Sequence, residues 1–81
     1  MEIREVLAVN LRRYRQAAKL SQEELADRAK IDRTYVSSLE RSRYAAGIDV
    51  VDRLAHALGV EAADLLLHPP PTTGRRRPAK R

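Results

Sequence analysis

Two short helices joined by a tight turn are predicted between Ser21 and Glu40, and this stretch constrains the fold more than any other. Ser21 and Glu24 have the spacing of a capping box, in which each side chain bonds the other residue's backbone amide at a helix start. The apolar pattern of that helix stops at Lys30, and Asp32 is a suitable N-cap for the next one. The stretch therefore predicts a helical hairpin rather than one long helix.

The second helix of this pair has an apolar face and a polar face. Val36 and Leu39 have the three-residue spacing of a buried stripe. The polar face carries Arg33, Thr34, Tyr35, Ser37 and Ser38. Short hydrogen-bonding side chains of this kind suit base edges in the major groove of DNA, which an α-helix fits. The alternative is an ordinary hairpin with tolerated hydroxyls, although a solvated face more often carries Lys and Glu one turn apart.

Three further helices are predicted from the apolar periodicity of the chain. The first should span about residues 2–18, the fourth about residues 48–58, and the fifth about residues 61–67. Gly59 is a typical residue just after a helix C-terminus. The buried face of the first helix should hold Ile3, Leu7, Leu11, Tyr14 and Ala18. The sequence therefore predicts an all-α fold, a compact five-helix bundle in residues 1–67.

The net charge of +5 is unevenly distributed along the chain. Residues 1–45 hold ten basic and seven acidic side chains, whereas residues 46–67 hold one basic and four acidic side chains. The N-terminal half can therefore face phosphates, and the C-terminal half is repelled by them. Residues 1–67 balance to zero, so residues 68–81, HPPPTTGRRRPAKR, carry the whole excess. Their prolines and basic residues predict a disordered tail. That tail either adds phosphate contacts to any nucleic acid or serves only as a solubilising terminus.

The composition argues against catalysis, cofactors and membranes. The chain has no cysteine, so it offers no disulfide framework and no thiolate metal site. It has no Gly-rich phosphate loop, and His56 is expected at the surface because no second metal ligand lies near it. No apolar run is long enough to span a membrane, and no signal-peptide pattern opens the chain. We therefore expect no cofactor, no metal, no enzymatic activity and a cytoplasmic location.

Two features beyond the helix pair indicate contacts with partners. Leu65, Leu66 and Leu67 point about 100° apart on a helix, so one small core cannot easily bury all three. The spare side chain suggests a homodimer contact, and a two-fold dimer would bind double-stranded DNA carrying an inverted repeat. Arg41 and Arg43 follow the second helix of the pair. Either the helix dipole favours cations there, or these arginines reach backbone phosphates or a minor-groove edge.

The stretch LRRYRQAAKLSQEELADRAKIDRTYVSSLERSRY, followed by VDRLAHALGVEAADLL, resembles the Cro/C1-type (XRE-like) helix-turn-helix family of phage repressors and small bacterial regulators. The resemblance covers residues 9–66, and IDRTYVSSLER is especially similar to controller proteins of restriction–modification systems. It implies a bacterial or phage-encoded, nucleoid-associated transcription regulator that binds specific DNA sequences as a repressor or autoregulator. It also implies that the third helix reads the major groove and that two subunits pair through the last helix.

The resemblance further implies roles for individual residues. Gln22 matches a position that contacts phosphate and orients a neighbouring side chain. Arg15 and Glu40 match an ion pair that bridges the first and third helices. Base contacts are implied for Arg33, Thr34 and Ser38, and base or backbone contacts for Tyr35 and Ser37.

Two positions depart from the family pattern. Lys30 stands where the family usually has glycine, so it is expected to adopt a positive φ at a cost of about 1 kcal/mol. Ala46 and Gly47 replace the usual proline and hydroxyl cap, which weakens the start of the fourth helix.

Two other functions are compatible with such a chain. An antitoxin of a toxin–antitoxin pair would bind its own promoter with the same fold and a toxin with its tail, although this tail lacks apolar anchors for a toxin groove. An interaction module would use the polar helix face on another protein. Co-purification of a second protein would support the antitoxin, and a salt-dependent shift of palindromic DNA would support the regulator.

Overall fold

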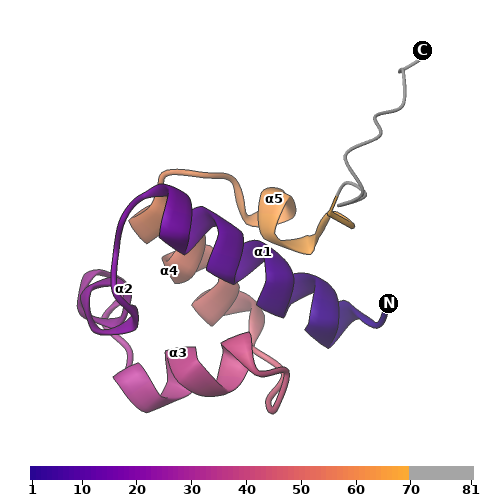
Figure 1. Cartoon of the computed structure of the whole chain (residues 1–81), viewed down its shortest axis with the longest axis horizontal. Helices are drawn as coiled ribbons and strands as arrows, with labels where there is room; N and C mark the ends of the chain where they lie inside the picture. Colours follow the sequence, from indigo (N-terminus) through magenta and orange to yellow (C-terminus); the bar gives the residue numbers. More distant parts are fainter. Residues whose placement is uncertain (70–81) are drawn as a thin grey trace.

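The computed structural model describes residues 1–69, and this part of the chain forms five α-helices. They are α1 (Ile3–Ala17), α2 (Gln22–Ala29), α3 (Arg33–Glu40), α4 (Ile48–Leu58) and α5 (Ala62–Leu66). In Figure 1, α1 crosses the front of the molecule with α4 behind it, and α2 is seen almost end-on at the left. α3 lies below α1 and α5 lies above it. The predicted all-α bundle of five helices is confirmed.

The core lies where the helices meet, and each helix contributes one leucine that is at most 1% exposed. These leucines are Leu11, Leu25, Leu39, Leu54 and Leu65. α2 packs against both α3 and α4, and α1 packs against both α3 and α5. Each buried leucine stabilises the fold by about 1.5–3 kcal/mol. The position of α3 therefore depends on apolar contacts from two sides.

The two helices of the predicted hairpin begin at the residues expected. The Ser21 hydroxyl accepts a hydrogen bond from the Glu24 amide at 3.0 Å, and the Glu24 carboxylate accepts one from the Ser21 amide at 2.8 Å. That backbone hydrogen bond from Ser21 is the main reason that the pKa of Glu24 lies below its ordinary value. The Asp32 carboxylate accepts from the Thr34 amide at 2.8 Å and caps α3. The predicted capping box and the second cap are both confirmed.

Four helices are followed by a reversal in which the first or second residue past the helix has positive φ. These residues are Lys19 (φ 61°), Lys30 (φ 60°), Ser42 (φ 59°) and Gly59 (φ 73°). After α2, the Ile31 amide donates to the Ala26 carbonyl at 3.0 Å, which closes the helix end. Three of the four residues are not glycine, so each carries strain in the left-handed region. The positive φ predicted for Lys30 is confirmed.

The buried face of α1 differs from the predicted one. Ile3 is 59% exposed and Ala18 is also exposed, whereas the buried set is Val6, Leu7, Ala8, Asn10 and Leu11. The predicted stripe was too long, because the ends of α1 extend past the side chains that cover its middle. The prediction also missed Asn10, a polar residue that is only 1% exposed.

Asn10 anchors the end of α5 to the middle of α1. Its side-chain amide donates to the Leu65 carbonyl at 3.0 Å and to the Leu67 carbonyl at 2.7 Å. Its own oxygen accepts a hydrogen bond from Arg13 at 3.1 Å. These three bonds satisfy the buried amide, as a polar group removed from water requires.

The structure corrects the assignment of Leu65 to a subunit contact. Its side chain is fully buried in the core of one subunit, so it has no surface left for a partner. Leu66 and Leu67 are 40% and 60% exposed. Because neighbouring residues of a helix point about 100° apart, the core takes the first leucine of the run and leaves the other two outside.

No helix within residues 1–69 combines the length and the apolar character needed to cross a membrane. The predicted tail begins at His68, and apart from His68 and Pro69 it lies outside the described residues.

Replacing Lys30 by glycine should stabilise the fold by roughly 0.5–1 kcal/mol. Glycine removes the left-handed strain, and part of that gain is offset by the greater freedom of glycine in the unfolded chain. A rise in melting temperature would be the readout. As a matched control, Arg28→Gly lies within α2, where glycine should lower the stability by about 1 kcal/mol. Destabilisation by Lys30→Gly would contradict the strain assigned to this turn.

Candidate DNA-binding surface

One end of α3 presents polar side chains to solvent. Arg33 and Thr34 in its first turn are exposed, and Tyr35 and Ser37 are partly exposed. The opposite face holds Val36 and Leu39, which are at most 1% exposed. The polar face predicted for these four residues is therefore present at the surface.

Ser38 does not belong to that exposed face. It is 7% exposed, because the chain reverses at Ser42 and returns against the end of α3. In this reversal the Arg43 amide donates to the Ser38 carbonyl at 2.9 Å. The prediction that Ser38 lies on the outer face is wrong, because helical periodicity does not include a loop that covers the helix.

Glu40 at the end of α3 joins three helices. Its carboxylate is 3% exposed and forms an ion pair with Arg15 of α1, with 2.7 Å from Nε to Oε2 and 2.9 Å from Nη2 to Oε1. Gln22 of α2 donates to Oε1 at 3.0 Å. Arg12 donates to the Glu40 carbonyl at 3.1 Å. The ion pair expected between Arg15 and Glu40 is thus formed, and Gln22 is bound to the same carboxylate.

The Arg15 guanidinium is bound both by Glu40 and by the backbone just before α2. Besides the two bonds to Glu40, its third nitrogen, Nη1, donates to the Leu20 carbonyl at 2.9 Å, just before α2 begins. The hydrogen bonds to Glu40, helped by the opposite charge, raise the pKa of Arg15 above its ordinary value although partial burial opposes this. The Glu40 carboxylate therefore favours the charged form of the Arg15 guanidinium.

The loop after α3 adds a second group of polar side chains. Arg41 and Arg43 are exposed, as expected from their place past the end of α3. Tyr44 is 59% exposed, and its ring meets the ring of Tyr35 edge to face, with centroids 6.3 Å apart. Tyr44 was given no role from the sequence, because its position depends on the reversal at Ser42. A tyrosine four residues past the last helical position was the only signal available.

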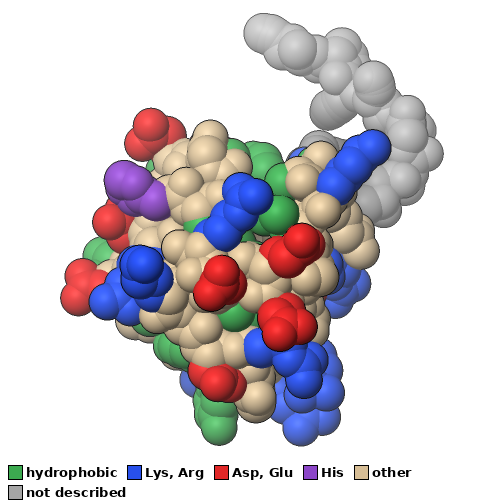
Figure 2. Space-filling model, turned by 90° about the vertical axis from the view of Figure 1, so that its left-hand side faces the viewer, with side chains coloured by type: hydrophobic (Ala, Val, Ile, Leu, Met, Phe, Trp, Pro, Cys, Tyr) green, Lys and Arg blue, Asp and Glu red, His purple; other side chains and the backbone are tan. Residues whose placement is uncertain are grey.

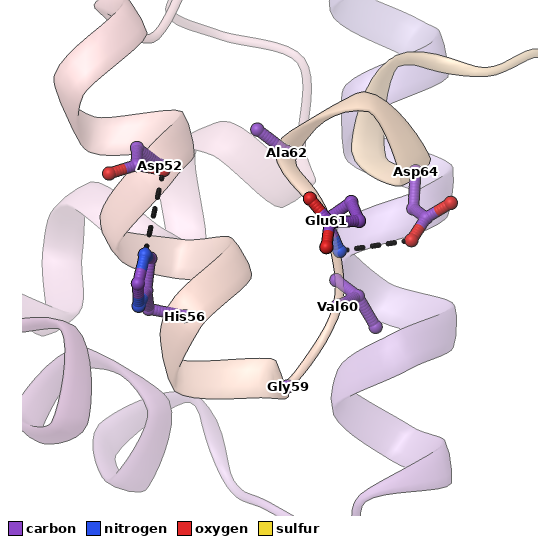
Figure 3. Close-up of a pocket in the computed structure, with 7 residues that line it drawn as sticks. All are labelled: Asp52, His56, Gly59, Val60, Glu61, Ala62 and Asp64. Atoms are coloured by element: carbon purple, nitrogen blue, oxygen red, sulfur yellow. Dashed lines mark hydrogen bonds and ion pairs between the residues drawn. The ribbon is translucent and has the colours of Figure 1, made fainter.

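The surface between α4 and α5 carries acidic side chains. Figure 2 shows Lys and Arg side chains gathered at its lower right, and a histidine with acidic side chains at its upper left. α4 and α5 border a hollow of about 400 Å³ (Figure 3). Its lining includes Asp52, His56, Glu61 and Asp64. The exposed His56 ring lies 3.8 Å from the Asp52 carboxylate. This lining has the wrong charge for phosphates, which agrees with the charge asymmetry of the sequence.

The paired helices, the polar face of α3 and the basic loop together define a helix-turn-helix protein. The helix-turn-helix family HTH_3 matches residues 11–65. The chain therefore belongs to this family, the Cro/C1 type of transcription regulators, whose members are not enzymes.

Relatives of this chain include proteins from two bacteria. A hypothetical transcription factor of Neisseria meningitidis is 47% identical over 84% of this chain, and the match spans 64% of that protein's length. Control protein C.SmaI of Serratia marcescens is 41% identical over 82% of this chain and 79% of its own. The crystal structure of the hypothetical transcription factor NHTF from Neisseria superposes with a TM-score of 0.82 at 47% identity, covering 84% of this chain and 78% of that one.

Arg15→Ala should destabilise the domain by about 2–4 kcal/mol, because Glu40 is left buried without its counter-charge. Arg15→Lys should cost less but remain destabilising, since lysine cannot form the two parallel bonds. Urea unfolding measures both variants, with Arg28→Ala as the control for losing an exposed helical arginine. A double-mutant cycle with Glu40→Ala should give a coupling of about 1–3 kcal/mol. A coupling of zero would show that the pair contributes nothing.

Proposed function

We propose that the protein is a transcription regulator that inserts α3 into the major groove of double-stranded DNA. The observation that carries this proposal is the exposed polar first turn of α3, with Arg33 and Thr34, on a helix whose other face is buried. The major groove admits an α-helix, and an arginine can bind guanine there through two donors. Thr34 and Ser37 supply shorter groups that donate or accept hydrogen bonds.

Residues around α3 are suited to phosphates rather than bases. Arg41 and Arg43 are exposed beyond its C-terminal end. Arginines of this kind fix the register of a protein on DNA without reading its sequence. The acidic lining near α4 and α5 repels phosphate, so the charge distribution favours one orientation on the duplex.

The proposed active species is a two-fold dimer on an inverted repeat. A single short helix reads only a few base pairs, and such a half-site recurs often in a genome. Leu66 and Leu67 supply exposed apolar surface at the end of α5. Leu66 also borders a groove of about 260 Å³ together with Ile3 and Ile48, which are 59% and 83% exposed. This apolar area lies over three helix ends and is suited to a second copy of the chain.

Repression, including repression of the protein's own gene, is the regulatory mode proposed. It requires only that the dimer occupies promoter DNA, and a domain of this size can do so without further parts.

Selection of bound sequences from a random duplex pool tests the function directly. The expected result is an enriched inverted repeat whose half-site centres lie about 34 Å apart, one turn of DNA. Enrichment of no sequence would contradict specific DNA binding. Enrichment of a single half-site without symmetry would contradict the dimer alone.

Arg33→Ala should weaken binding to the selected site by about 1–3 kcal/mol and relax the preference at one base position. The reason is the loss of a two-donor contact to a base. Gel-shift titrations on the site and on single-base variants measure both effects. Arg28→Ala removes the same charge from an exposed position of α2 and should leave the base preference unchanged. An equal loss on all sequences would show that Arg33 contacts only phosphate.

Leu66→Glu and Leu67→Glu should give folded monomers that no longer bind the operator tightly. Burying such a leucine contributes about 1.5–3 kcal/mol per subunit, which is enough to shift a weak dimer strongly towards monomer. Sedimentation measures the association, and circular dichroism checks that the helices persist. Gln16→Glu adds the same charge at an exposed position of α1 as a control. If both leucine variants remain dimeric, the interface lies elsewhere.

A further inference from the structure

Two tyrosines connect α3 to the loop that follows it. The rings of Tyr35 and Tyr44 have centroids 6.3 Å apart and planes inclined at 73°, an edge-to-face arrangement that aromatic pairs favour. Tyr35 comes from the first half of α3, whereas Tyr44 lies beyond the reversal at Ser42. Because Tyr44 is 59% exposed, this contact lies at the surface rather than in the core.

Arg43 lies between two attachments of the loop to α3. On one side its own amide donates to the Ser38 carbonyl at 2.9 Å. On the other side the next residue, Tyr44, contacts Tyr35 through its ring. The reversal itself is unfavourable, since Ser42 has a φ of 59° without being glycine. The Ser42 amide also donates to the Leu39 carbonyl at 3.1 Å, and the ring pair adds an attachment of the loop beyond these backbone bonds.

The hydroxyl groups of the pair are not used within the domain. Within residues 1–69, neither phenol forms a hydrogen bond with another residue. Tyr44 directly follows Arg43 in the loop, and its partner Tyr35 lies in the first half of α3, next to Thr34 of the polar face. A ring attached there restrains the loop without filling the core.

We propose that Tyr44 is a positioning residue of the DNA-binding surface. By packing on Tyr35, it places the Arg43 guanidinium against a backbone phosphate next to the bases that α3 contacts. This inference rests on the proposed function, and it adds a residue to which neither the sequence motif nor the family resemblance gives a role. Tyr44 acts through Arg43, so its removal should resemble the loss of that arginine.

Three variants on the selected operator test the inference. Tyr44→Ala should weaken binding about three- to tenfold and reduce the slope of log affinity against log salt by about 0.9, the value for one phosphate contact. Tyr44→Phe keeps the ring pair, so its salt slope should equal that of the unchanged protein. Tyr44→Ala added to Arg43→Ala should weaken binding by less than about twofold beyond Arg43→Ala alone, because both remove the same contact.

Several results would overturn the inference while leaving the function intact. One is an unchanged affinity and salt slope in Tyr44→Ala when the parent protein binds its operator. Another is a full additive loss in the double variant, which would separate Tyr44 from Arg43. A large fall in the melting temperature of Tyr44→Ala would show a folding role instead. Failure of the parent protein to select any DNA would instead overturn the proposed function itself.

Discussion

The buried carboxylate of Glu40 is the interaction on which the geometry of this domain depends. It accepts hydrogen bonds from Arg15 of α1 and Gln22 of α2, and it lies at the last residue of α3. Apolar packing holds the same helices together, but it is not directional. Two parallel bonds from a planar guanidinium are directional, so they fix how far α3 can rotate or slide. The positions of the exposed side chains of α3 therefore depend on the Glu40 carboxylate, which is almost fully buried.

Local signals were enough to predict most of the fold. The capping box at Ser21, the cap at Asp32 and the glycine at position 59 set helix ends because each acts within a few residues of itself. The same is true of the exposed first turn of α3, where Arg33 and Thr34 follow directly from the cap. The link between Arg15 and Glu40 came only from the family resemblance, since nothing in the spacing of the two residues requires it.

The features that were missed depend on how distant segments meet. Ser38 is buried because of a reversal that its own helix does not encode, and Tyr44 finds its partner for the same reason. Asn10 was given no role from the sequence, yet it binds two carbonyl groups more than fifty residues away. Leu65 was separated from Leu66 and Leu67 only once the path of α5 over α1 was known. Periodicity describes one helix at a time, whereas the positions of these side chains depend on contacts between two segments.

α1 rigidly connects α5 to the C-terminal end of α3. Asn10 fastens it to α5, where the partner subunit is proposed to sit, and Arg12 and Arg15 fasten it to the end of α3. A helix of this length is a stiff rod of about 22 Å. In the proposed dimer, the distance between the two reading helices is therefore set by a rigid part rather than by a linker. Inserting one base pair between the half-sites moves them about 3.4 Å apart and turns one about 34° relative to the other. A rigid dimer cannot adjust to this change. The spacing of the half-sites in the operator should therefore matter as much as their base sequence.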